Sequence, residues 1–329
     1  MSLFSTIADF LKPAPPLDPN LRKALGRVSE LVNPILQQVP GFEKQLAFPM
    51  QHALGYCDGL VNALPGPIEI NRRAFSDDPL VHALFATAND IEQMLGRSQA
   101  VRDFLATPCS FESDHFYAMF AARRHQKKQF GMAQQGEIIR NDVPQQVLFF
   151  SDQTMVEPSC QLDTTHLNLR CKALESLLLT FHSHVEALRH EQQGLRADAS
   201  VERAHLTTLR GTTPGQAYQV HTRHLAELDA RLRETSASLM PDQLLAALAE
   251  FLSAPQNALC LTPFSINVDR LGIVHEPTEN DINVHTLHFP ELKARDNRLH
   301  LAMLARINRE EAVQAVEMVR DQQHRFMLI

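Results

Sequence analysis

The chain has no tryptophan and only 12 glycines among its 329 residues. So few glycines argue against glycine-rich phosphate-binding loops and against all-β folds with many tight turns. The motifs agree, because the sequence contains no G-x-S-x-G, G-x-G-x-x-G or G-x-x-x-x-G-K-[ST] pattern. The nucleophile-elbow, dinucleotide-binding and P-loop classes are therefore not predicted.

Cysteine is also scarce and poorly spaced for a structural role. The five cysteines are odd in number, and no two have the C-x-x-C spacing of a zinc or redox site. A disulfide framework is therefore not expected. Buried thiols that contribute to the core are favoured over a catalytic Cys–His pair.

Long hydrophobic runs are missing as well. The least polar stretch, residues 45–67, is interrupted by Asp58 and by three prolines, so no membrane-spanning helix is predicted. The N-terminus lacks the basic segment and the small-residue cleavage site of a secretory signal. We therefore expect a cytoplasmic protein.

Acidic residues outnumber basic ones by 38 to 31, which gives a formal net charge of −7. This balance argues against general binding to nucleic acids or anionic membranes. One basic run, Arg123–Lys128, has aromatic neighbours that would suit a nucleic-acid patch. We favour the alternative that it is the solvated end of a helix predicted over 113–126, where cations complement the helix dipole.

The order of patterns along the chain predicts three regions. Residues 1–16 contain an amphipathic helix with a proline-rich connector, and residues 17–128 are helical. Residues 129–329 form an α+β region, which either stands alone or makes one domain with 17–128. Because an isolated helix this short is marginal in water, we expect the N-terminal stripe to dock on the chain's own body or on a partner.

Two segments have the turn residues and apolar runs of short strands, at 130–156 and 258–289. We predict a short β-meander at each, and the two could pair into one small antiparallel sheet. The segments between and after them are helical, including a last helix over 297–325. The predicted fold class is therefore α+β and mostly helical.

A long helical block separates the two strand regions. Apolar residues recur in it every seven positions, at Leu167, Leu174, Phe181, Leu188 and Leu195. Gly211 marks a reversal, and Thr213-Pro214 is typical of the start of another helix. We predict a long antiparallel helical hairpin, coiled-coil-like in its spacing, with the stripe of the first helix against the second.

Histidine is unusually frequent, with 16 copies. Glu202-x-x-His205 has the spacing found in carboxylate-bridged metal bundles, and other histidines share helix faces with acids. The candidate metal ligands are His182, Glu186, His190, Glu202, His205, His221 and His224. The competing interpretation, which we favour, is that these histidines are solvated or satisfied within the core.

Two functions are consistent with these patterns. The favoured one is a non-catalytic cytoplasmic interaction or scaffold protein, without a cofactor, that binds a protein partner or itself, with the N-terminal helix as a candidate contact. The alternative is a hydrolase or oxidase that uses a divalent transition metal on the helices of residues 160–230. A polar cluster around Asp269 and Arg270 either lines a pocket or forms the rim of a hairpin. No catalytic residue is assigned.

Overall fold

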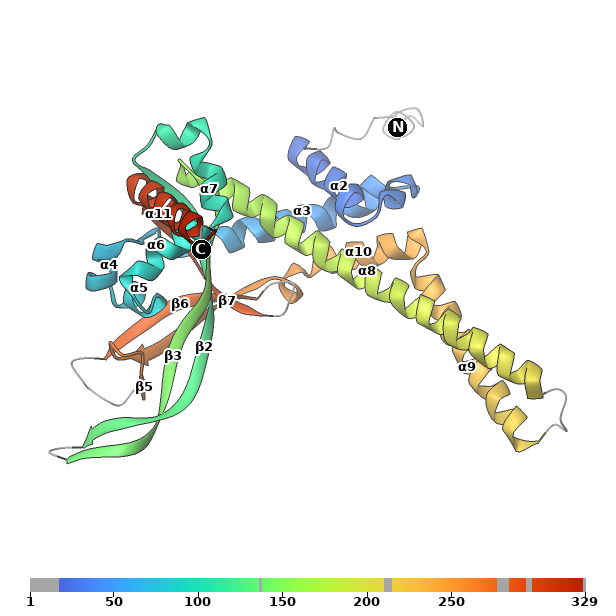
Figure 1. The fold of residues 1–329 in the computed structure, drawn as a ribbon. Helices are drawn as coiled ribbons and strands as arrows, with labels where there is room; N and C mark the ends of the chain where they lie inside the picture. The colour runs from blue at the N-terminus through green and yellow to red at the C-terminus, as the bar shows by residue number, and fades with distance from the viewer. Residues whose placement is uncertain (1–17, 136–137, 210–214, 277–283, 294–297, 328–329) are drawn as a thin grey trace, which may run out of the picture. The chain divides into compact units, whose positions relative to one another are not determined.

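A computed structural model describes residues 18–135, 138–209, 215–276, 284–293 and 298–327 (Figure 1). Contacts group the chain into two compact units. The helical unit comprises Met1–Ala53 and Leu178–Ala254, and the sheet unit comprises Leu54–Leu177 and Pro255–Ile329. The predicted helix over 2–12 lies outside the described residues, and the predicted boundaries at 16 and 128 stay predictions.

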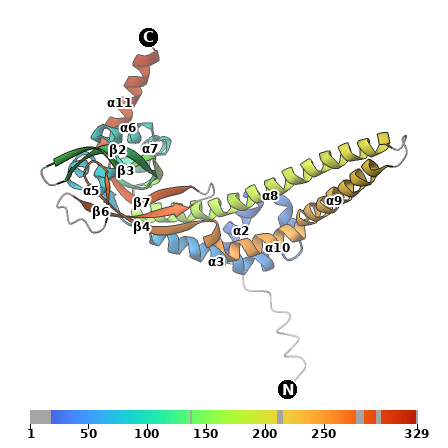
Figure 2. The same cartoon turned by 90° about the horizontal axis from the view of Figure 1, so that it is seen from below.

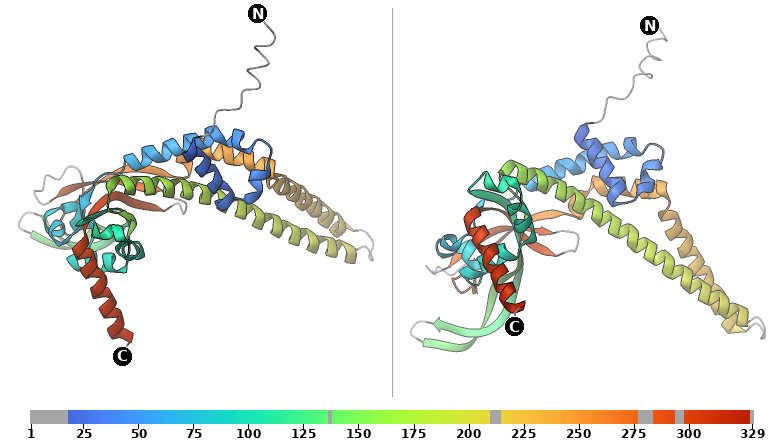
Figure 3. Two further views of the ribbon diagram at one scale, coloured as in Figure 1. Left: turned by 90° about the horizontal axis from the view of Figure 1, so that it is seen from above. Right: turned by 45° about the horizontal axis from the view of Figure 1, so that its top comes forward.

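The helical unit contains a short N-terminal group of helices and the long hairpin. It consists of α2 (Pro19–Leu31), η1 (Pro34–Gln38), the start of α3 (Phe42–Asn62), the end of α8 (Leu162–Leu209), α9 (Gln216–Ser238) and α10 (Pro241–Ser253). Figure 3 shows α8 and α9 side by side. Their buried contact is made by Leu195 and Ala199 of α8 with Leu228 of α9.

The seven-residue repeat on α8 meets different neighbours along its length. Leu195 contacts α9, whereas the Phe181 ring lies 5.5 Å from the ring of Phe251 on α10. Leu167 is 56% exposed. The repeat therefore does not form one continuous coiled-coil seam within the described part of the chain.

The sheet unit is built on one seven-stranded sheet in the order β3-β2-β7-β6-β4-β5, with β1 beside β7. All pairs are antiparallel except β1 with β7. An isolated bridge pairs Val147 of β3 with Ile273, the residue before β5. The strands are β1 (Ile68–Glu69), β2 (His115–Gln135), β3 (Ile138–Ser159), β4 (Cys260–Val268), β5 (Val274–His275), β6 (His285–Lys293) and β7 (Leu299–Asn308).

Short helices bury one face of this sheet (Figure 2). They are α4 (Arg72–Asp77), α5 (Pro79–Leu84), α6 (Ala88–Arg97), α7 (Gln99–Leu105) and α11 (Arg309–Met327), with η2 (Pro108–Phe111) and η3 (Pro255–Asn257) as connectors. Phe116, Phe120 and Met303 of the sheet meet Ile91 and Phe104 of the helices in the main core. Gly96 lets α6 approach α11 closely, because a Cβ atom there would collide with the backbone oxygen of Ala315.

The predicted fold class is wrong about the number and the arrangement of the strands. Helices make up 61% of the described residues and strands 25%, and one large sheet replaces the two short β-meanders. The helix predicted over 113–126 is instead the first half of β2, paired with β3 on one side and β7 on the other. The first third of the helix predicted over 297–325 is β7. Its residues 301–305 are all buried, and a strand covered on both faces reads as a continuous apolar run.

Membrane-spanning helices were also predicted to be absent. Among the helices that the structure describes, none combines the length and the apolar character needed to cross a bilayer.

Candidate functional site

Four of the seven candidate metal ligands meet where α8 and α9 lie side by side. Glu202 and His205 are one turn apart on α8, and His221 and His224 are one turn apart on α9. The Nδ1 atoms of His221 and His224 lie 2.8 and 2.7 Å from the two carboxylate oxygens of Glu202. One ligand atom from each of Glu202, His205 and His221 lies within 4.8 Å of the other two.

The carboxylate at the centre of this cluster is the most shielded member of the trio with His221 and His224. The Glu202 side chain is 13% exposed, against 33% for His221 and 52% for His224. Hydrogen bonds from His224 and His221 lower the pKa of the Glu202 carboxyl below its usual range. Glu202 is therefore held in the ionised form, which is the form that binds a metal ion.

Two exposed salt bridges also connect the helices near this cluster. Arg203 of α8 lies 2.6 Å from Asp229 of α9, and Arg231 of α9 lies 2.8 Å from Glu191 of α8. The buried contact of Leu195 and Leu228 determines which turn of α9 faces Glu202, and the exposed pairs are consistent with that register. The four ligand side chains thus stand on a defined helix pair.

The other three candidates lie elsewhere on α8. The Nδ1 atom of His182 is 3.1 Å from the backbone oxygen of Val32 at the end of α2, which fits a histidine satisfied within the fold. Glu186 forms a salt bridge with Arg189, one turn along the same helix. His190 is exposed. None of these three belongs to the described cluster.

The sheet unit contains a cavity of about 770 Å³ between α4–α5, β3 and the turn after β4. Asp269 and Arg270 of that polar cluster line it. The Asp269 carboxylate accepts hydrogen bonds from the backbone nitrogens of Leu271 and Ile273, both at 2.9 Å. Asp78 accepts one from the nitrogen of Leu80 at 2.8 Å. Both acids therefore shape the backbone.

His82 also lines the cavity, and no sequence pattern singled it out. Its Nδ1 and Nε2 atoms lie 3.1 and 3.2 Å from the backbone oxygens of Phe75 and Arg270. The ring thereby links α4–α5 to the turn after β4. A histidine inside a short helix gives no signal of such a long-range contact.

The basic run Arg123–Lys128 lies in β2, so the predicted helix end is wrong. Within it, Arg124 forms a salt bridge with Glu291 of β6 at 2.6 Å and lies 4.1 Å above the ring of Phe264. The side chains of Arg124 and Glu291 are 18% and 7% exposed. This cation is therefore neutralised within the fold.

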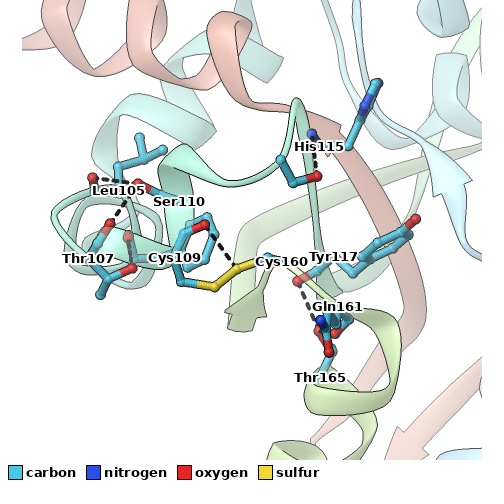
Figure 4. Close-up of a disulfide and its surroundings, with 11 residues drawn as sticks. Leu105, Thr107, Cys109, Ser110, His115, Tyr117, Cys160, Gln161 and Thr165 are labelled. Atoms are coloured by element: carbon cyan, nitrogen blue, oxygen red, sulfur yellow. Dashed lines mark hydrogen bonds between the residues drawn. A yellow bond between two sulfur atoms is a disulfide. The ribbon is translucent and has the colours of Figure 1, made fainter.

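The thiols do not form a nucleophilic site in the described structure. Cys109 of η2 and Cys160, just before α8, form a disulfide across 51 residues (Figure 4), although the cysteine spacing argues against a framework. Burial, and then the charge of Asp58, raise the pKa of the Cys57 thiol to about 12. A thiol with so high a pKa is a poor nucleophile at neutral pH.

Neither of the two described cavities includes a residue of the Glu202 cluster. No family model, curated protein or solved structure matches this chain, so its function must be inferred from its own residues.

Proposed function

We propose that the protein is a non-catalytic interaction protein, and that the outer part of the β2–β3 hairpin is its contact element. This part, residues 127–146, is called the arm. Pairing of β2 with β7 ends at Arg123, whereas pairing of β2 with β3 continues to Gln135 and Ile138. Figure 1 shows the two strands continuing away from β7. The arm is thus a two-stranded ribbon without β7 alongside it.

The observation that carries the proposal is the apolar surface of the arm. Alternate residues of a strand point to the same face, so Phe130 and Met132 share a face with Phe120, which is fully buried in the core. Phe130 is 75% exposed and Met132 is 70% exposed. Phe130 is paired with Pro144 of β3. Arg124, Gln126 and Lys128 lie between these exposed residues of β2 and the core on this face, so Phe130 and Met132 form a separate exposed apolar pair, which is a candidate contact surface.

The charge of the arm favours a protein partner over a nucleic acid. Arg124 is neutralised by Glu291, and Lys127 and Lys128 are neighbours in a strand and point to opposite faces. The arm's other described cation, Arg140, lies on β3 opposite Ala133. A ribbon that follows a phosphate backbone needs cations gathered along one side. We infer a protein partner with an apolar contact surface and acidic residues around it.

Site-specific photocrosslinking tests this proposal. A photoreactive phenylalanine analogue replaces Phe130, and the matched control replaces Phe48, an equally exposed phenylalanine (78%) in the helical unit. We expect a discrete crosslinked protein from position 130 only. That protein, once purified, should bind the wild type and bind Phe130→Glu/Met132→Glu about tenfold more weakly.

The result that contradicts the proposal is equal crosslinking at both positions, or equal binding of the partner to the double variant. Because both side chains are largely exposed, the double variant should keep its circular-dichroism spectrum. A changed spectrum would call for the milder variant Phe130→Ser in the same binding assay.

A metal-dependent hydrolase or oxidase is the second candidate, and the Glu202 cluster is the observation in its favour. A catalytic site also needs a cavity for its substrate. The described cavity of the helical unit reaches Leu188, about 20 Å along α8 from Glu202 at 1.5 Å per residue. The cluster therefore favours metal binding more than catalysis.

A cytoplasmic location also remains a proposal.

A further inference from the structure

We propose that Glu202, His205 and His221 bind a single Zn²⁺ ion, or a similar divalent transition metal, which joins α8 to α9. This site is independent of the arm. Its ligands would be two imidazole nitrogens and one carboxylate oxygen, a donor set that zinc favours. Ca²⁺ and Mg²⁺ prefer all-oxygen sites and fit this set poorly.

The distances are close to those of a bound site. Zinc–ligand bonds of about 2.0–2.2 Å place neighbouring ligand atoms of a tetrahedral site roughly 3.4 Å apart. The three ligand atoms lie within 4.8 Å of one another, so each pair must approach by at most about 1.4 Å. His205 is exposed, and rotation of its side chain can supply this movement.

The hydrogen bonds already present prepare the carboxylate. His221 donates to one oxygen of Glu202 and His224 to the other, if both carry the proton on Nδ1. When His221 binds the metal through Nδ1, the ring proton moves to Nε2, and the contact between Glu202 and His221 is replaced by two metal–ligand bonds. His224 keeps its hydrogen bond and orients the carboxylate, as outer partners commonly do in metal sites.

The cluster joins residues that are close in space but on different helices. His205 and His221 lie on either side of the connection between α8 and α9, and their ring centroids are 5.7 Å apart. A metal bound by both would hold the last turns of α8 against the first turns of α9. The expected consequence is slower amide exchange in this end of the hairpin.

Zinc binding to the full-length chain tests the proposal. Isothermal titration should give one Zn²⁺ per chain at this site, and each of Glu202→Gln, His205→Ala and His221→Ala should weaken binding at least tenfold. His224→Ala should weaken it by about 10-fold to 100-fold, as for an outer partner. The matched control is His190→Ala, which removes an exposed α8 histidine outside the cluster and should leave the affinity unchanged.

Hydrogen exchange provides a second readout. Zn²⁺ should slow amide exchange around Glu202 and His221 in the wild type and in His190→Ala, but not in His205→Ala. Exposed His205 can be removed without unfolding the helices, and circular dichroism checks this. The proposal is wrong if the cluster variants bind Zn²⁺ as tightly as the control. It is also wrong if binding is lost only when the free cysteines, Cys57, Cys171 and Cys260, are replaced by serine.

Discussion

The pair formed by Arg124 and Glu291 shows how burial changes the effect of a charge. Glu291 is 7% exposed, so its removal would leave the guanidinium of Arg124 shielded from water without a counter-charge. We therefore expect Glu291→Ala to lower the free energy of unfolding by about 3–5 kcal/mol. The measurement is urea-induced unfolding followed by circular dichroism.

An exposed pair in the same unit is the control. Arg73 and Asp77 are 90% and 67% exposed and lie 3.5 Å apart, so Asp77→Ala should change the stability by less than about 1 kcal/mol. Equal losses in the two variants would mean that burial does not govern the strength of these pairs.

At the same scale, local spacing predicted part of the candidate site. Glu202 and His205 come together because residues three apart on a helix share a face, and α9 adds His221 and His224 once the hairpin forms. His182 has the same kind of spacing with Glu186, yet it contacts the backbone of Val32. Spacing places side chains on a face, but only the fold decides what that face meets.

At the scale of elements, the largest error is the helix predicted where β2 lies, although the sequence contains the spacing of a strand. Phe116, Ala118, Phe120 and Ala122 are all buried, and their spacing of two is that of a strand. Only the pairs four apart, Phe116 with Phe120 and Ala118 with Ala122, also fit a helix, where the two pairs would lie on opposite faces. The pairing partner that resolves the ambiguity, β7, lies more than 170 residues further along the chain.

The link between η2 and the start of α8 could not be predicted either, because cysteines 51 residues apart carry no pairing signal. A disulfide that closes a loop of this length lowers the entropy of the unfolded chain. In the chain-entropy model, this stabilises the folded state by about 4 kcal/mol. We expect Cys109→Ser to destabilise the sheet unit by up to this amount in urea unfolding under oxidising conditions.

Reduction provides the internal control for that variant. When a reductant is added, the free energy of unfolding of the wild type should fall by about as much as the Cys109→Ser substitution lowers it. The free energy of unfolding of Cys109→Ser should not respond to the reductant. Cys171→Ser, which replaces an exposed free cysteine, should resemble the wild type in both conditions. An unchanged wild type under reduction would show that the bond contributes little to stability.

At the scale of the whole molecule, each unit is assembled from two separate stretches of chain. Composition and periodicity are read along the chain, so they suggest boundaries between consecutive regions. A unit that combines residues before 54 with residues after 177 has no such boundary signal. The sheet illustrates this, since it joins β2 and β3 from the first half of the sequence to β7, β6, β4 and β5 from the second.

This organisation makes a prediction about unfolding, because units with separate cores need not unfold together. Phe120 is fully buried in the core of the sheet unit, and Leu248 is fully buried in the helical unit. We expect Phe120→Ala and Leu248→Ala to lower the free energy of unfolding by about 3–5 and 2–5 kcal/mol, respectively.

Hydrogen exchange across a urea series should show each loss in its own unit: in β2 and β7 for Phe120→Ala, and in α9 and α10 for Leu248→Ala. Helices α3 and α8 contribute to both units and are the only described helices expected to respond to both variants. If either variant lowers protection uniformly in both units, the chain unfolds as one cooperative body and the division is one of contacts alone.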